Sequence, residues 1–259
     1  MRKTDIEITT AITAREQLFD YLNRLQLPKP ASEVNAIKAP RVITDKTQIS
    51  LLDTDTISAT IQAKRLYPNA RIAILNFASY KHPGGGFMAN RFAQEEAICY
   101  CTNLYPELAK YQEWYDKHLS NLNRGLYANE SILTHNISIV ASQRGVLLNP
   151  ADIFTIDVLT CAAPNWTLAT KYKTISLDVA AMATKQRVDY VMNMLSQDGY
   201  DIIILGAYGC GVFRNDPVIV AQSFAVGIAK YYGCFRQAIF AIPDATGTNY
   251  QAFKNVLGI

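Results

Sequence analysis

Short apolar segments rich in β-branched residues alternate along this sequence with segments of helical periodicity. Strands are predicted over 41–43, 48–52, 72–76, 138–141, 154–160, 202–205 and 238–242. Helices are predicted over 56–66, 94–108, 185–196, 217–231 and 249–257, after an amphipathic N-terminal helix that ends before Pro28. Strands that are apolar on both faces are typical of a sheet between two layers of helices. The pattern predicts an α/β fold with a mixed, mostly parallel sheet sandwiched between helices and an N-terminal helical extension.

The composition favours a single globular domain. The 259 residues are 49% hydrophobic and 18% charged, and no linker or low-complexity tract divides them. The formal net charge of +3 is too small to indicate a nucleic-acid binder dominated by phosphate contacts. We therefore expect residues 1–40 to form a helical extension and residues 41–259 to form one domain.

Cysteine and histidine usage predicts a protein of the reducing cytoplasm without a metal or cofactor. The five cysteines include no CxxC pair, and the three histidines show no zinc-ligand spacing. The N-terminus lacks the apolar core of a signal peptide, and no apolar run is long enough to cross a membrane. We expect no membrane association and no obligate protein partner.

The first candidate site follows the predicted strand 72–76. Gly84, Gly85 and Gly86 are consecutive, and Gln94, Glu95 and Glu96 open the next predicted helix. Glycines allow backbone N–H groups to approach a ligand closely, and ligands bind beyond the carboxyl ends of parallel strands. Two glutamates in a first helical turn also stabilise the helix dipole, which is the purely structural alternative. Because a long glycine loop precedes these glutamates, we favour a functional site.

The second candidate site follows the predicted strand 202–205. Glycines 206, 209 and 211 lie between that strand and a helix that begins Asn215-Asp216-Pro217. Backbone amides in such a loop can hold a diphosphate. The spacing matches neither the dinucleotide-binding nor the P-loop pattern, and alone it is a weak signal.

Two other groups of residues favour structural roles. The aromatic residues Tyr105, Tyr111, Trp114 and Tyr115 have near-helical spacing, which predicts packing against the core. Lys171, Lys173, Lys185 and Arg187 are predicted to form a solvated face.

The two glycine-rich loops together resemble the poly(ADP-ribose) glycohydrolases. The family's catalytic signature is similar to the run of three glycines, seven further residues and Gln-Glu-Glu in this chain. The sequence from Leu205 to Pro217 is similar to that of the short bacterial, microbial type of the family. The resemblance extends from about residue 40 to the final helix. Tyr208 stands where tryptophan is usual, Lys81-His82 where Lys-Asn is common, and 126–135 matches poorly. The resemblance implies a macrodomain-like fold that holds ADP-ribose in a cleft at the strand ends.

The resemblance also implies roles for individual residues. Glu96 would be the catalytic residue, whereas Glu95 and Asn76 would hold ribose hydroxyls at the scissile end. Phe213 would lie near the adenosine-side ribose. The implied substrate-binding residues are Asn76, Gly84, Gly85, Gly86, Gln94, Gly206, Tyr208, Gly209, Cys210, Gly211, Val212 and Phe213.

The implied reaction is hydrolysis of the ribose–ribose O-glycosidic bond of poly(ADP-ribose), from the chain end, with release of ADP-ribose. Adjacent helical side chains diverge by about 100°, so Glu95 and Glu96 are not expected to flank one bond, and a single carboxyl group is expected to transfer the proton. Two alternatives stay open. One is a mono-ADP-ribosyl hydrolase that acts on modified protein or nucleic acid, and the other is a non-catalytic reader that binds ADP-ribose.

Overall fold

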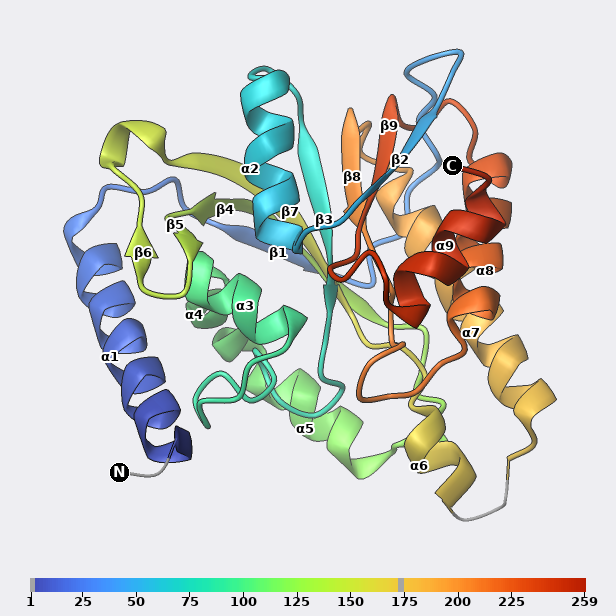
Figure 1. Ribbon diagram of the computed structural model, residues 1–259, viewed down its shortest axis with the longest axis horizontal. Coiled ribbons are helices and arrows are strands. Elements are labelled where there is room, and N and C mark those ends of the chain that lie inside the picture. The colour runs from blue at the N-terminus through green and yellow to red at the C-terminus, as the bar shows by residue number, and fades with distance from the viewer. Residues whose placement is uncertain (1–2, 172–174) are drawn as a thin grey trace.

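The computed structural model describes residues 3–171 and 175–259 and shows a sheet covered by helices on both faces (Figure 1). Within these residues the seven-stranded sheet has the order β1-β4-β7-β3-β8-β9-β2. Its strands are β1 (Ala31–Val34), β2 (Gln48–Leu52), β3 (Ile72–Phe77), β4 (Ser131–Ile139), β7 (Phe154–Cys161), β8 (Ile202–Leu205) and β9 (Gln237–Ala241), and β5 (Ala141–Gln143) and β6 (Val146–Leu147) form a separate hairpin.

The strands from β7 across to β2 are parallel, whereas β4 is antiparallel to both β7 and β1. The expected mixed, mostly parallel sheet is therefore confirmed. The carboxyl ends of β7, β3, β8, β9 and β2 lie along one edge. Both predicted glycine-rich loops leave the sheet at this edge, after β3 and β8.

Two hydrophobic cores cover the two faces of the sheet. The helices are α1 (Lys3–Arg24), α2 (Thr56–Leu66), α3 (Gln94–Cys101), α4 (Leu104–Leu108), α5 (Gln112–Ser120), α6 (Trp166–Lys171), α7 (Leu177–Leu195), α8 (Pro217–Lys230) and α9 (Thr248–Leu257), with short 3₁₀ turns η1 (Ala109–Tyr111), η2 (Asn123–Gly125) and η3 (Pro150–Asp152). Helices α1 to α4 pack against one face and α7 to α9 against the other (Figure 1). On β3, Ile72 and Ile74 enter the first core, and Ala73 and Leu75 enter the second. This alternation explains why β3 is apolar from Ile72 to Leu75.

Several predicted elements are confirmed closely. Helix α2 spans the predicted residues, and Asp55 caps it by accepting hydrogen bonds from the N–H groups of Ile57 and Ser58. Strand β8 also has the predicted bounds. Asp216 caps α8, and Pro217 occupies its first turn.

Other predictions about elements were wrong. Residues 41–43 form no strand, and β1, which pairs with β4, was not predicted. The predicted helix 94–108 is interrupted at Thr102, whose extended backbone forms a bridge with Ile139. Helix α7 begins earlier than predicted, with Ser176 as its cap. The division of the chain at residue 40 stays a proposal, and β1 belongs to the sheet although it precedes that residue.

No helix in the described part of the chain is long and apolar enough to cross a membrane.

Candidate active site

Glu95 is held against the end of β3. Its side chain is 3% exposed, and one carboxyl oxygen accepts a hydrogen bond of 2.7 Å from the backbone N–H of Ser79. The other accepts one of 3.2 Å from the side-chain amide of Asn76, which also donates to the hydroxyl of Thr160. The last polar residue of β3 and the loop that follows it therefore fix this carboxyl group.

Burial controls the protonation of Glu95. Desolvation raises the pKa of its carboxyl group to about 8, against the opposing effect of the hydrogen bonds from Ser79 and Asn76, and the neighbouring charge of Glu96 adds to the rise. At neutral pH the carboxyl group of Glu95 in the unliganded site is mostly protonated. A neutral carboxyl group can donate one hydrogen bond and accept others, which suits contact with sugar hydroxyls.

Glu96 joins the start of α3 to the glycine run. One of its carboxyl oxygens accepts a hydrogen bond of 2.7 Å from the N–H of Gly86, and the other accepts one of 2.9 Å from the N–H of Ala93. The side chain is 7% exposed, so it does not point into bulk solvent. The first turn of α3 thus carries both glutamates to the carboxyl edge of the sheet.

The two glutamates converge on Gly85, which differs from the expected divergence of adjacent helical side chains. A β-carbon on Gly85 would lie 2.6 Å from Oε1 of Glu96 and 2.7 Å from Oε2 of Glu95. Gly85 also has a φ of +62°, a conformation that favours glycine. The absence of a side chain at this position is what leaves room for both carboxyl groups.

The neighbouring glycines are also tightly enclosed. A β-carbon on Gly84 would lie 2.7 Å from the ring of Tyr105, and one on Gly86 would lie 2.6 Å from the side chain of Arg91. These two positions therefore shape the loop by close packing.

Gln94 fastens α3 to the rest of the site. Its side-chain oxygen accepts a hydrogen bond from the N–H of Phe77, and its amide donates to the carbonyl of Leu75 and the hydroxyl of Thr56. The side chain thus links α3 to both β3 and α2. These contacts position the two glutamates that follow it.

The second glycine-rich loop is anchored from below by Asn215. The amide of Asn215 donates to the carbonyls of Gly209 and Pro164, and its oxygen accepts a hydrogen bond of 2.8 Å from the hydroxyl of Thr184. A β-carbon on Gly209 would lie 2.4 Å from this amide. A glycine at 209 is therefore required for the loop to pack against Asn215.

The side chains of this loop point in different directions. Tyr208 is buried, and its hydroxyl donates to the carbonyl of Cys161. Burial also raises the pKa of the Cys210 thiol to about 12, so this thiol is not reactive. Gly211 has open space around its α-carbon, Val212 is 79% exposed, and Phe213 is half-buried. A contact from Tyr208 to a ligand would therefore come from its backbone. Gly206 packs closely against Phe77 and the carbonyl of Ala241.

A row of stacked aromatic rings leads to Phe213, and the sequence analysis missed it. The ring of Tyr80 stacks on the rings of His118 and Tyr127, with distances between ring centroids of 4.2 Å and 4.1 Å. The ring of Tyr127 contacts that of Phe213 edge-on, with a centroid distance of 6.1 Å. These residues come from four separate segments, so no spacing in the sequence could have revealed the row. The row extends from α5 to the second loop.

A pocket of about 280 Å³ joins the two glycine-rich loops. It is lined by Asp55, Thr56, Ile57, Phe77, Phe92, Ala93, Gln94, Ala97, Ile98, Ala207, Ala241, Ile242, Pro243 and Asn249. These residues come from the carboxyl ends of β3, β8 and β9 and from the first turns of α2, α3 and α9. The pocket therefore reaches the start of α3 at Gln94 and the start of the second loop at Ala207, although neither Glu95 nor Glu96 lines it.

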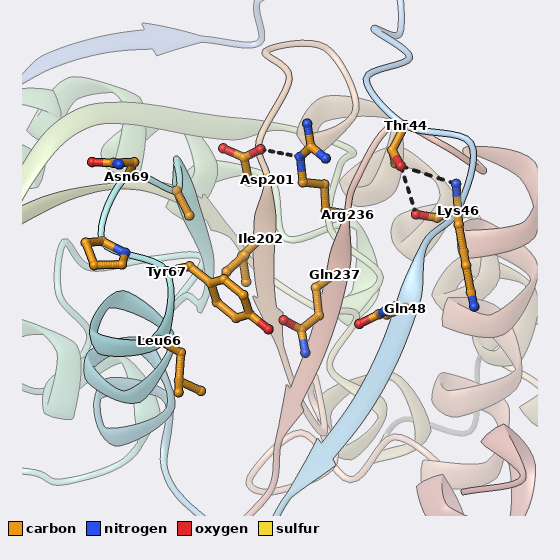
Figure 2. Close-up of a pocket in the computed structure, with 12 residues that line it drawn as sticks. Thr44, Lys46, Gln48, Leu66, Tyr67, Asn69, Asp201, Ile202, Arg236 and Gln237 are labelled. Atoms are coloured by element: carbon orange, nitrogen blue, oxygen red, sulfur yellow. Dashed lines mark hydrogen bonds and ion pairs between the residues drawn. The ribbon is translucent and has the colours of Figure 1, made fainter.

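A larger cavity, of about 640 Å³, lies at the opposite edge of the sheet (Figure 2). Gln48, Ile202 and Gln237, at the starts of three parallel strands, line it, and none of the predicted site residues does. The charged side chains of Arg236 and Asp201 pair with each other there at 2.9 Å.

Comparison with known proteins shows the family to which the chain belongs. The family "microbial-type PARG, catalytic domain" matches residues 3–141, which include the first glycine-rich loop and both glutamates. A search of curated proteins found no match.

Solved structures of bacterial poly(ADP-ribose) glycohydrolases share the fold of the whole chain. The enzyme of Thermomonospora curvata matches at a TM-score of 0.77 with 24% identity over 97% of this chain and 99% of that one. Its complex with the inhibitor ADP-HPD matches at 0.78, with the same identity and coverage. The enzyme of Deinococcus radiodurans in complex with ADP-ribose matches at 0.72 with 26% identity over 97% of this chain and 92% of that one. With a family match over more than half of its residues, this chain belongs to the microbial-type family of poly(ADP-ribose) glycohydrolase (PARG) catalytic domains.

Proposed function

We propose that this protein hydrolyses the ribose–ribose O-glycosidic bond of poly(ADP-ribose) from the chain end and releases ADP-ribose. The observation that carries the proposal is the convergence of two buried carboxyl groups, of Glu95 and Glu96, on Gly85 at the carboxyl edge of the sheet. The bacterial enzymes of this fold, one solved with ADP-ribose and one with ADP-HPD, support the choice of substrate.

In the proposed reaction Glu96 is the general acid and then the general base. Its protonated carboxyl group gives a proton to the 2′-oxygen as the bond between this oxygen and the anomeric carbon breaks. The resulting oxocarbenium-like sugar is attacked by a water molecule, which Glu96 deprotonates. Glu96 ends the cycle protonated, so the reaction consumes one water and needs no cofactor. Glu95 and Asn76 hold the hydroxyls of the reacting ribose.

The remaining parts of ADP-ribose fit the neighbouring features. The diphosphate lies along the loop Gly206–Phe213, where backbone N–H groups can bind it. The base occupies the pocket of about 280 Å³ that Ala207 lines between that loop and α2. Phe213, packed against Tyr127, closes the cleft beyond the adenosine ribose, which favours cleavage from the chain end.

Substrate comparison tests the proposal. Purified protein is incubated with poly(ADP-ribose), with mono-ADP-ribosylated protein and with ADP-ribosylated DNA, and products are separated by chromatography. We expect monomeric ADP-ribose from the polymer from the earliest times, without short oligomers. Release from only the mono-ADP-ribosylated substrates would make the protein a mono-ADP-ribosyl hydrolase, and binding without any release would make it a reader.

Replacement of Gly85 by alanine is expected to reduce hydrolysis at least tenfold and to destabilise the protein by about 1–3 kcal/mol. The new β-carbon meets the carboxyl oxygens of both glutamates, so at least one must move, and the φ of +62° adds strain. Initial rates of ADP-ribose release and thermal denaturation measure the two effects.

The matched control is Gly145→Ala. Gly145 has a similar φ of +80°, but a β-carbon there meets only Ala14, at an ordinary distance of 3.7 Å. This variant should lose stability and keep its rate. A normal rate in Gly85→Ala would contradict the positioning of the carboxyl groups by Gly85.

A further inference from the structure

Helix α7 supports the second glycine-rich loop from beneath. The hydroxyl of Thr184 holds Asn215, which in turn holds the carbonyl of Gly209. Arg187 follows Thr184 by three residues, so it lies on the same face of α7. Arg187 therefore lies on the face of α7 that supports the loop Gly206–Phe213.

Arg187 is buried, contrary to the predicted solvated face, whereas Lys171 and Lys185 are exposed and Lys173 lies outside the described residues. The Arg187 side chain is 2% exposed. Its guanidinium donates to the side-chain oxygen of Asn129 at 2.7 Å, to the carbonyl of Leu126 at 3.3 Å and to the carbonyl of Ala162. These three acceptors carry no net charge.

The positive charge of Arg187 has no counter-ion in contact with it. Within residues 3–171 and 175–259, Arg187 forms no ion pair with a carboxylate. The carboxylate of Glu130, the residue after Asn129, contacts His118 and not Arg187. A buried charge without a partner is costly.

The guanidinium is close to the second loop. Its acceptor Ala162 directly follows β7, and the preceding carbonyl, of Cys161, accepts the hydrogen bond from Tyr208. Burial raises the pKa of the Tyr208 hydroxyl, and the adjacent charge of Arg187 opposes this rise. The guanidinium thus lies near the buried hydroxyl of Tyr208, a residue of the loop that would hold the diphosphate.

We propose that Arg187 is a positioning residue that attracts the substrate's diphosphate to the loop Gly206–Phe213 through its uncompensated charge, without touching the substrate. The inference rests on the proposed function, since it takes an ADP-ribose unit as the ligand. In a buried setting the attraction between charges is only weakly screened by water and salt. Arg187 therefore contributes to affinity for phosphorylated ligands and not to affinity for the nucleoside alone.

The test compares Arg187→Lys, which keeps the charge, with Arg187→Gln, which keeps a polar side chain and removes the charge. Lys185→Gln is the matched control, because it removes the same charge from an exposed position on α7. Dissociation constants for ADP-ribose and for adenosine are measured at fixed low salt by calorimetry and competition. We expect Arg187→Gln to bind ADP-ribose about 10- to 100-fold more weakly and adenosine within about twofold of wild type. Arg187→Lys and Lys185→Gln should bind both ligands within about threefold of wild type.

Three results would overturn the inference. The first is that Arg187→Gln binds ADP-ribose as tightly as the wild type, and the second is that it loses affinity for ADP-ribose and adenosine equally. The third is that neither Arg187 variant folds. Each result would leave Arg187 with a structural role or none. A wild-type protein that does not bind ADP-ribose would instead refute the proposed function, and this inference with it.

Discussion

Glu96→Gln is expected to release ADP-ribose from poly(ADP-ribose) at least 10²–10⁴-fold more slowly than the wild type, the range that a general acid typically contributes. Glutamine has nearly the shape of glutamate but cannot give a proton to the leaving 2′-oxygen or take one from water. Single-turnover release of ADP-ribose measures the chemical step. Affinity for ADP-ribose, measured by calorimetry, should stay within about threefold of wild type, since the product still meets the same loops and pocket.

The Glu96→Gln variant is also expected to be less stable than the wild type. Glu96 accepts hydrogen bonds from two N–H groups, of Gly86 and Ala93, and the single oxygen of glutamine can satisfy only one of them. A loss of about 1–3 kcal/mol is therefore expected, and rates must be compared well below the melting temperature. Glu107→Gln replaces another buried glutamate, which pairs with Lys110 away from the glycine loops, and should keep the wild-type rate. If Glu96→Gln turns over normally, Glu96 is not the acid.

Local patterns predicted the elements that carry the site. Strand β8 and helix α2 have their predicted bounds because each is determined by neighbouring residues, an apolar β-branched run for β8 and an N-terminal cap for α2. The two glycine-rich loops were found for the same reason. Each needs glycine at particular positions, such as Gly85 and Gly209, where a β-carbon would collide with the site.

Features that depend on distant residues could not be predicted. The break at Thr102 reflects a bridge to Ile139, a contact between segments far apart in the chain. Arg187 was assigned to the surface because charged residues are usually exposed, and its three acceptors come from two other segments, 126–129 and the residue after β7. The convergence of Glu95 and Glu96 depends on the path of the glycine loop, which the spacing of the motif does not specify.

The buried carboxyl group of Glu95 is expected to make the protein less stable as the pH rises. Its pKa is about 8 in the folded state, against an ordinary value of 4.5, so between these values the folded protein binds a proton that the unfolded chain has lost. The free energy of unfolding therefore falls with increasing pH through this window and levels off above pH 8, by a total on the order of 3–5 kcal/mol. For a chain of this length the melting temperature should fall by roughly 10 °C from this group alone.

Other groups titrate in the same range, so the measurement is a difference between wild type and Glu95→Gln. The pKa of His135 is raised by its hydrogen bond to Asp157, and that of His118 is lowered by burial, but both histidines are present in either protein. Thermal or urea denaturation from pH 5 to pH 8.5 should show the variant gaining on the wild type as the pH rises, because glutamine has no proton to lose. Parallel curves for the two proteins would mean that Glu95 is ionised at neutral pH. In that case the neutral hydrogen-bonding role proposed for Glu95 would fail, while the assignment of Glu96 as the acid would still stand on its own test.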